Sequence, residues 1–325
     1  MDISVKYMGL ELKNPIIIGS SGLSNSVEKI KILAQNNASA VVLKSIFEEQ
    51  IESEALNNSQ NFDYPEAFDY LNEYSKANSK EKYLKLIQDA RQNVDIPIIS
   101  SINASSNGAW TNFAKEIEQA GAHAIELNIA ILPVNPEIDA SKIEKTHLQI
   151  LENVRKAVKI PIAVKLSSYQ SAMANLIQQI AWSKTTDAVV LFNRFYNPDI
   201  DINQMSIVSS HVFSNAEDIM PSLRWIALLS PQFKNINFAA TTGVYTGEDV
   251  IKQLLVGADA VQIVSAIYKH GPNFINTILN QIKEWMQQKK FNKISDFKGK
   301  LNMENCKEAS IYERIQFMKY YGSIE

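Results

Sequence analysis

Residues 160–193 read IPIAVKLSSYQSAMANLIQQIAWSKTTDAVVLFN and hold one repeat of the pattern that decides the fold. The apolar run IPIAVKL predicts a strand, residues 170–183 have the periodicity of a helix, and TTDAVVLFN predicts a second strand. Neither run alternates regularly between apolar and polar residues, which is typical of parallel strands covered on both faces. The stretch therefore predicts a β-α-β unit.

The same pattern recurs along the chain in eight short apolar runs of two kinds. Four begin with an amide residue or with Ile-Pro: NPIIIGS from Asn14, IPIISSI from Ile96, IPIAVKL from Ile160 and NINFAAT from Asn235. Four begin with small residues: ASAVVLKS from Ala38, GAHAIELN from Gly121, TTDAVVLFN from Thr185 and GADAVQIVS from Gly257. Each run of the second kind follows one of the first by about 25 residues, which a strand, a helix and two loops require.

Stretches with helical periodicity separate these runs. They cover residues 25–35, 79–92, 111–120, 142–158, 170–183, 221–229, 246–256 and 271–288. Eight parallel strands that alternate with helices predict an α/β protein with a (β/α)8 TIM barrel in a single domain. A doubly wound open sheet is the rival architecture, but it calls for G-x-G-x-x-G after the first strand, and the sequence lacks that motif.

We expect residues 1–301 to form the barrel, including an N-terminal strand segment, and residues 302–325 to form a C-terminal extension. Residues 48–76 and 193–220 are insertions relative to the bare repeat. Long loops after barrel strands carry lids and binding arms, so we expect such a role for both insertions.

Composition excludes several classes of protein. The 32 basic and 35 acidic residues are spread along the chain, so no basic stripe predicts nucleic-acid binding. Cys306 is the single cysteine, which rules out an intramolecular disulfide or a cysteine-ligated cluster. The N-terminus has no signal-peptide pattern, and no run reaches the roughly 18 apolar residues of a membrane-spanning helix. We therefore expect a cytoplasmic protein without a membrane partner.

Polar residues and glycines gather at the C-terminal ends of the expected strands, where barrel enzymes build their active sites. They are Ser20, Ser21, Gly22, Lys44, Ser45, Asn103, Glu126, Asn128, Lys165, Asn193, Thr241, Thr242, Gly243 and Ser265. A lysine on an apolar strand is costly to bury without a partner, so the two lysines indicate a functional site. The structural alternative is an ion pair between Glu126 and Lys165 inside the barrel.

The ends of the last two strands point to a phosphate. Thr241-Thr242-Gly243 ends the seventh strand, and Val264-Ser265-Ala266 ends the eighth. In such barrels backbone N–H groups at this place commonly hold a phosphate, so we expect a cofactor or substrate that carries one. The alternative is that Gly243 only makes a tight turn.

In order and spacing, several segments are similar to those of the dihydroorotate dehydrogenases. The segments are N14-P-I-I-I-G-S-S-G22, V41-V-L-K-S45, E126-L-N128, V164-K-L166, N193, T242-G-V-Y-T-G247, L254-L-V-G-A-D-A-V-Q-I263, H270-G-P272 and D296-F-K-G-K-L301. They extend over nearly the whole chain as far as Leu301. Their combination is specific to this family, whereas any one of them alone would be weak.

The resemblance implies one FMN across the barrel mouth and a small-molecule substrate. Lys165 would lie by the flavin N1/O2 edge and stabilise the reduced anion, with Lys44 near flavin and substrate. Asn128 and Asn193 match two substrate-binding asparagines and join these lysines in the predicted catalytic set, and Asn135 is a candidate for a third asparagine. The predicted FMN contacts are Ser20, Ser21, Gly22, Lys44, Ser45, Asn103, Asn128 and Lys165 around the ring, and Thr242, Gly243, Val264 and Ser265 at the phosphate.

The chain departs from the family pattern at several positions. The family prefers glycine where Thr242 and Val264 stand, and its further substrate asparagine has no counterpart between residues 48 and 72. Ile131 occupies the place of the cysteine or serine that removes the C5 proton of dihydroorotate. Glu137 and Asp139 are the only ionisable groups in this loop. A carboxylate of the two could act as the base if the loop folds inward; the alternative is that both are solvated loop charges.

Other reactive side chains predict no further site. Cys306 lies after the last barrel helix, where we expect it to be a spectator. His123, His147, His211 and His270 lack the spacing of metal ligands, so we expect no metal site.

We expect an FMN-dependent oxidoreductase that converts dihydroorotate to orotate in pyrimidine biosynthesis, slowly or in an altered way because the base is missing. Its electrons would leave to a soluble acceptor or a partner redox protein, and a homodimer is possible. Two alternatives stay open: an FMN barrel with another substrate, and a non-catalytic barrel subunit.

Overall fold

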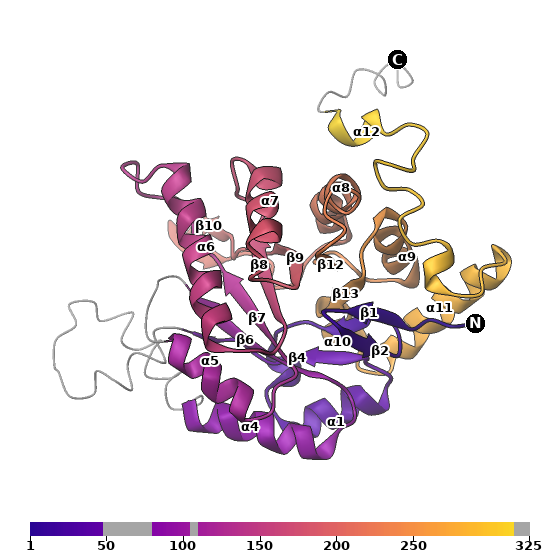
Figure 1. The fold of residues 1–325 in the computed structure, drawn as a ribbon, viewed down its shortest axis with the longest axis horizontal. Helices are drawn as coiled ribbons and strands as arrows, with labels where there is room; N and C mark the ends of the chain where they lie inside the picture. The colour runs from indigo at the N-terminus through magenta and orange to yellow at the C-terminus, as the bar shows by residue number, and fades with distance from the viewer. Residues whose placement is uncertain (48–79, 105–109, 315–325) are drawn as a thin grey trace.

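The computed structural model describes residues 1–47, 80–104 and 110–314 (Figure 1). The insertion at residues 48–76, where we looked for the family's further asparagine, lies outside the described residues. The last part of the expected C-terminal extension, from residue 315 onward, also lies outside them.

A closed ring of parallel strands forms the centre of the molecule. The order β4-β3-β13-β12-β9-β8-β7-β6 is closed by pairing of β4 with β6, and β5 (Ile46–Phe47) adds a short pairing with β6. The ring strands are β3 (Ile16–Ile18), β4 (Ala40–Val42), β6 (Ile98–Ala104), β7 (Ala124–Ile129), β8 (Ile162–Ser167), β9 (Ala188–Asn193), β12 (Asn237–Thr241) and β13 (Ala260–Ile263). Each begins within one of the eight apolar runs and ends no more than two residues beyond it, so the predicted (β/α)8 barrel is confirmed.

Helices surround this ring. They are α1 (Val27–Gln35), α4 (Lys80–Asn93), α5 (Trp110–Gln119), α6 (Ala140–Ala157), α7 (Met173–Ser183), α8 (Ile219–Leu229), α9 (Gly247–Val256) and α11 (Phe274–Gln288). Each agrees with a predicted helix to within a few residues. Local chemistry sets several starts: the Ser26 side chain accepts from Lys29 N at α1, and Thr246 and Asp249 form a capping box at α9.

Residues on the strands alternate between two apolar cores. Ile16 and Ile18 pack outward against the helices, whereas Ile17 faces the barrel interior. The interior is lined mainly by small residues, namely Ala40, Ala124, Ala163, Ala188, Ala239 and Ala260. Small side chains leave space along the barrel axis, and large residues from outside the ring must fill it.

An N-terminal hairpin supplies those large residues. It consists of β1 (Val5–Tyr7) and β2 (Leu10–Leu12), and its Tyr7, Met8 and Leu12 complete the inner core. Met8 N donates to Asn237 Oδ1 at 2.9 Å, which fixes the hairpin to the start of β12. The hairpin therefore closes the end of the barrel opposite to the strand C-termini.

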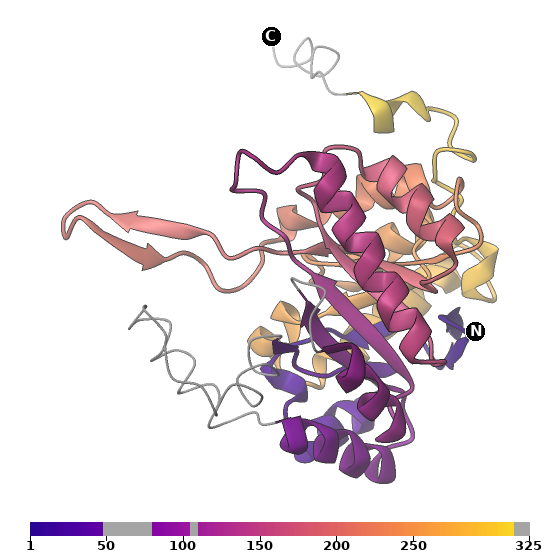
Figure 2. The ribbon, with the colours of Figure 1, turned by 60° about the vertical axis from the view of Figure 1, so that its left-hand side comes forward.

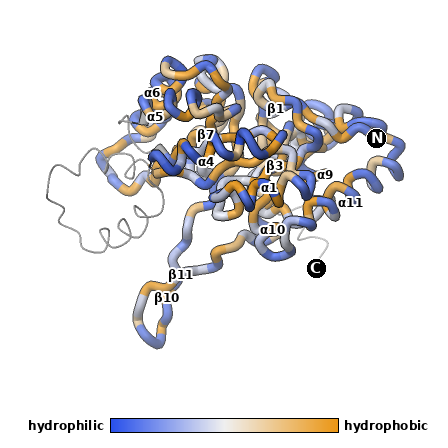
Figure 3. The backbone as a smooth tube through the Cα atoms, turned by 90° about the horizontal axis from the view of Figure 1, so that it is seen from below, coloured by the Kyte–Doolittle hydropathy of each residue, from blue (hydrophilic) through white to orange (hydrophobic). Residues whose placement is uncertain are grey.

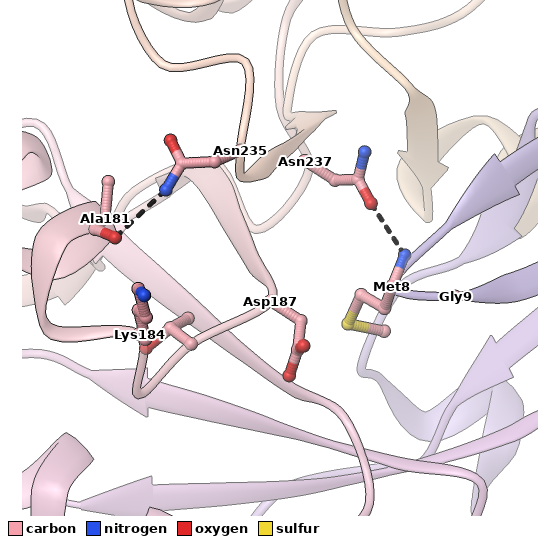
Figure 4. A pocket seen from close by; sticks show the side chains of 8 residues that line it. Met8, Gly9, Ala181, Lys184, Asp187, Asn235 and Asn237 are labelled. Atoms are coloured by element: carbon pink, nitrogen blue, oxygen red, sulfur yellow. Dashed lines mark hydrogen bonds between the residues drawn. The ribbon is translucent and has the colours of Figure 1, made fainter.

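A polar cavity of about 260 Å³ lies beside this hairpin (Figure 4). Its lining includes Lys184, Asp187, Asn235 and Asn237, which stand at the N-terminal ends of barrel strands or just before them. Asn235 Nδ2 donates to Ala181 O at 3.1 Å, so at least part of this polar lining already serves the structure. In this fold such residues at the N-terminal face serve stability rather than catalysis.

A second hairpin extends away from the body (Figure 2). It consists of β10 (Pro198–Asp201) and β11 (Ser206–Ser209), with Ile200 paired to Ile207. Both isoleucines are exposed, at 67% and 78%, and Figure 3 shows apolar residues along this arm. The hairpin lies in the predicted insertion at residues 193–220, but the sequence pattern did not predict its strands.

Short elements complete the described chain: η1 (Gly22–Ser24), η2 (Ala216–Asp218), α10 (Ser265–His270), η3 (Ile294–Asp296) and α12 (Ser310–Glu313). The C-terminal segment is held to α8 by a bond from Met303 N to Ala227 O at 2.9 Å. In the described ranges, no helix is both long and apolar enough to cross a membrane.

Candidate active site

Three predicted site residues lie in one row across neighbouring strands. Asn103 on β6 is in register with Asn128 on β7, which is in register with Lys165 on β8. All three stand near the C-terminal ends of their strands, so the barrel brings them to one mouth as predicted. Lys44 follows the end of β4 and is half-buried.

Lys165 belongs to a buried polar ring. Its Nζ lies 3.5 Å from Glu126 Oε1 and donates to Gln262 Oε1 at 3.3 Å. Gln262 Nε2 in turn donates to Glu126 Oε2 at 2.5 Å. The ion pair that we considered as a structural alternative is therefore present, with side-chain exposures of 10% for Lys165 and 2% for Glu126.

The sequence interpretation missed Gln262. Its position on β13 is buried, and the strand alternation that points Lys165 and Glu126 inward also points Gln262 inward. A polar residue in the run GADAVQIVS was the available signal. Gly19 leaves the room that this side chain needs, because a Cβ there would lie 3.3 Å from Gln262 Oε1 and 2.9 Å from Val264 Cγ2.

Tyr7 of the N-terminal hairpin reaches the inner core below this ring. Burial, with the negative charges of Glu126 and Asp259, raises its pKa well above the usual range. The hydroxyl is buried, and no partner for it occurs in the described part of the chain. Tyr7 therefore closes the barrel beneath Glu126 as a neutral group.

Hydroxyl groups line another part of the mouth. Ser45 Oγ lies 2.9 Å from Ser20 Oγ and 2.8 Å from Ser101 Oγ. The predicted Ser20 and Ser45 thus come together, and the buried Ser101 is an addition that the sequence interpretation missed. Beside them, Ser21 caps η1 through a bond from Leu23 N.

Thr242 and Gly243 form a sharp turn after β12. Their φ values are 75° and 74°, both in the left-handed region. A Cβ on Gly243 would lie 2.2 Å from Ile219 N, so close packing against the start of α8 requires glycine here. The turn interpretation of Gly243 therefore has direct structural support, and contact with a phosphate stays a prediction.

The segment before α8 approaches the end of β13. Ser214 donates to Ser265 Oγ from its N at 3.2 Å and from its Oγ at 3.1 Å. The Tyr245 hydroxyl donates to Ser214 O. Ser265 and Val264 thus lie where predicted, at the start of α10, but Ser214 and Tyr245 were missed because no motif singles them out.

Three buried oxygens on strands β7 and β8 have no hydrogen-bond partner among the described residues: Asn128 Oδ1, Ser167 Oγ and Glu126 Oε1, of which the last lies 3.5 Å from Lys165 Nζ as an ion-pair partner. Ser167 ends β8 and is in register with Asn193, another predicted site residue. Thr242 Oγ1 donates at 3.0 Å to the carbonyl of Phe192, next to Asn193. A buried acceptor without a partner indicates that a ligand supplies the donor. Asn128 stands between Asn103 and Lys165 in the row described above.

The loop after β7 offers no inward-facing base. Ile131 is half-buried against the outer core, and Glu137 is exposed. Asp139 Oδ1 accepts from Lys142 N at 2.7 Å and so caps α6. That bond is the largest cause of a lowered pKa at Asp139. The solvated interpretation of both carboxylates is favoured, and Asn135 is likewise exposed, with its side chain bonded to Glu137 N.

The remaining reactive groups lie apart from the mouth. His123 contacts Arg91, and His147 is bonded to Ile143 O within α6. Cys306 is half-buried in the segment after η3, which agrees with a spectator role. No group of three or more His, Cys, Asp or Glu side chains suited to a metal occurs among residues 1–47, 80–104 and 110–314.

The model of the dihydroorotate dehydrogenase family matches residues 2–286. The chain belongs to the dihydroorotate dehydrogenase family. The catalytic subunit of dihydroorotate dehydrogenase B (NAD(+)) from Thermoplasma volcanium is 27% identical over 313 residues, covering 92% of this chain and 98% of that protein.

Two further relatives carry the names of both B and A types. The dihydroorotate dehydrogenase B (NAD(+)) catalytic subunit of Methanocaldococcus jannaschii is 25% identical, with 88% of this chain and 94% of the relative covered. Dihydroorotate dehydrogenase A (fumarate) of Lactococcus lactis subsp. cremoris is 24% identical, with 92% and 99% covered. The family resemblance inferred from motifs is confirmed.

FMN is the cofactor of dihydroorotate dehydrogenases and is the cofactor expected for this chain. The mouth fits that group at the ring end, where Lys165 is in register with Asn128, whose buried Oδ1 has no partner among the described residues. At the other end, the left-handed turn at Thr242 and Gly243 follows β12, and α10 begins just after β13, the strand beside it.

Proposed function

We propose that the chain is an FMN-dependent oxidoreductase that converts dihydroorotate to orotate. The observation that carries the proposal is the row of Asn103, Asn128 and Lys165, in which an amide oxygen is buried without a partner. An amide offers a donor and an acceptor side by side, which suits the imide edge of a pyrimidine. FMN, when bound, supplies the hydride acceptor.

Each residue has a defined task in this proposal. Lys165 supplies positive charge to the N1/O2 edge of the flavin, and Lys44 orients flavin and substrate. Asn128 and Asn193 bind the pyrimidine. Ser20, Ser21, Gly22, Ser45 and Asn103 line the ring, and Thr242, Gly243, Val264 and Ser265 hold the phosphate.

The missing base limits the rate. Ile131 cannot accept a proton, and Glu137 and Asp139 are exposed, with Asp139 engaged as a helix cap. Loss of a general base costs about 10²–10⁴-fold. We therefore expect slow oxidation of dihydroorotate, with the proton passed to solvent.

The test is orotate formation by protein loaded with FMN, with Lys165→Met as the comparison. Slow orotate production that the substitution abolishes would support the proposal. A flavin-loaded protein that makes no orotate, with either fumarate or an artificial dye as acceptor, would contradict it.

A second candidate is an FMN barrel with another substrate, which the apolar Ile131 favours. This side chain packs against the outer core, so the loop in this conformation offers a pyrimidine no proton acceptor. A screen of dihydropyrimidines and enones for flavin bleaching or reoxidation separates the two candidates.

We also propose a soluble electron acceptor, or a partner redox protein, and a homodimer. The hairpin β10–β11 is the surface that favours association, because Ile200 and Ile207 form an exposed pair on an extended arm. Ile207→Asp should shift the sedimentation coefficient from dimer to monomer. A parent chain that sediments as a monomer would contradict the dimer.

A further inference from the structure

We propose that Glu126 and Gln262 are positioning residues that orient the Lys165 ammonium and limit the positive charge it presents to bound flavin. The inference rests on the proposed function, since it requires FMN at the barrel mouth. It adds two residues, from β7 and β13, to the site on β8.

One orientation of the Gln262 amide suits both of its neighbours in the ring. An ionised carboxylate only accepts, so Glu126 requires the Nε2 side of the Gln262 amide. The amide oxygen must then face Lys165, as the 3.3 Å bond shows. Glu126 therefore sets the direction of the Gln262 amide, and the amide in turn directs the lysine.

The arrangement leaves Lys165 able to donate to a ligand as well. An ammonium has three N–H groups; one donates to Gln262 Oε1 at 3.3 Å, and Glu126 Oε1 lies 3.5 Å from Nζ as an ion-pair partner. Glu126 is 2% exposed and Tyr7 closes the barrel below it, whereas Lys165 is 10% exposed. Of these two charged groups, Lys165 is therefore the one that a ligand at the mouth can reach.

The ring also sets the charge of the site. The Glu126 carboxylate, 3.5 Å from the Lys165 ammonium, opposes the positive charge of that group. Reduced flavin is anionic at its N1 edge, so a fully compensated lysine stabilises it less than a free one would. Neutralising Glu126 should therefore favour reduced over oxidised FMN.

The experiment compares the parent with Glu126→Gln by measuring the reduction potential of bound FMN against a reference dye. The shift from free FMN gives the ratio of the dissociation constants of oxidised and reduced FMN. We expect this ratio to rise on the order of tenfold in Glu126→Gln, as for loss of one nearby charge. Glu11→Gln, which removes an exposed carboxylate, is the matched control and should leave the ratio unchanged.

A second variant keeps the inference testable if Glu126→Gln does not fold. Gln262→Leu retains both charges but removes the amide that directs Lys165. We expect the dissociation constant of oxidised FMN to be roughly tenfold higher in Gln262→Leu than in the parent. In the cofactor-free form, Gln262→Leu should lower the unfolding midpoint less than Lys165→Met does.

The outcomes are distinct. A folded Glu126→Gln protein whose ratio stays within twofold of the parent, or falls, would overturn the positioning role while leaving FMN binding intact. An unchanged FMN affinity in Gln262→Leu would overturn the role of the amide. A parent chain that does not bind FMN would overturn the proposed function and this inference together.

Discussion

Replacing Lys165 removes one partner of the buried ion pair with Glu126, and the structure indicates how far this lowers the free energy of unfolding. Lys165→Met leaves Glu126, which is 2% exposed, with its charge uncompensated except by Gln262. Methionine has a similar length, so packing changes little. Removing one partner of a buried ion pair costs about 3–5 kcal/mol in unfolding free energy.

Combining Lys165→Met with Glu126→Gln should recover most of that loss, because no buried charge remains unpaired. Lys6→Met is the control, since Lys6 and Glu11 form an exposed pair with exposures of 68% and 78%. We expect the control to change stability by less than about 1 kcal/mol. The assay is denaturant unfolding of the cofactor-free protein, followed by circular dichroism.

The result that would refute the reasoning is a Lys165→Met protein no less stable than Lys6→Met. A double variant less stable than Lys165→Met alone would also refute it, since the cost would then not come from the unpaired carboxylate.

The other predictions concern the loop, the turn and a buried histidine. Ile131→Cys should raise the rate of flavin reduction by dihydroorotate at least tenfold over the parent; an equal gain in Ile131→Ala would show that the thiol is not the cause. Gly243→Ala should destabilise by more than about 2 kcal/mol, because its Cβ would lie 2.2 Å from Ile219 N at φ 74°, whereas Gly9→Ala, also at φ 74° but with open space, should cost about 1–2 kcal/mol less than Gly243→Ala. His147 is buried, and desolvation lowers its pKa from the usual 6.5. Below pH 6.5 the unfolded chain therefore binds more protons at this residue than the folded protein does. Unfolding free energy should fall as pH drops below that value, and less steeply in His147→Gln, with the exposed His211→Gln as control; equal slopes in all three proteins would contradict this.

The strands and helices of the barrel could be predicted because each obeys a local rule. The strand runs, such as those that contain Ile17 and Val190, are apolar on both faces. The stretches that separate one run from the next have helical periodicity. The register of Asn103, Asn128 and Lys165 follows from parallel strands whose ends meet at one rim. The convergence of these three residues at one rim was therefore predictable from the fold.

Other features depend on contacts that no local pattern encodes. The ring of Gln262 with Glu126 requires three strands far apart in sequence, and Ser214 meets Ser265 only through the loop before α8. The hairpin β10–β11 has exposed isoleucines on both strands, so it lacks the alternation of a half-buried strand. The role of Asp139 as the cap of α6, which favours the solvated interpretation of that carboxylate, is visible only in the structure.

Anaerobic mixing of the FMN-loaded protein with dihydroorotate tests the central claim most directly. The account predicts slow but complete bleaching of the flavin absorbance, with one orotate formed per flavin, and loss of the reaction in Lys165→Met. A flavin that dithionite reduces but dihydroorotate leaves oxidised at saturating concentration would contradict it.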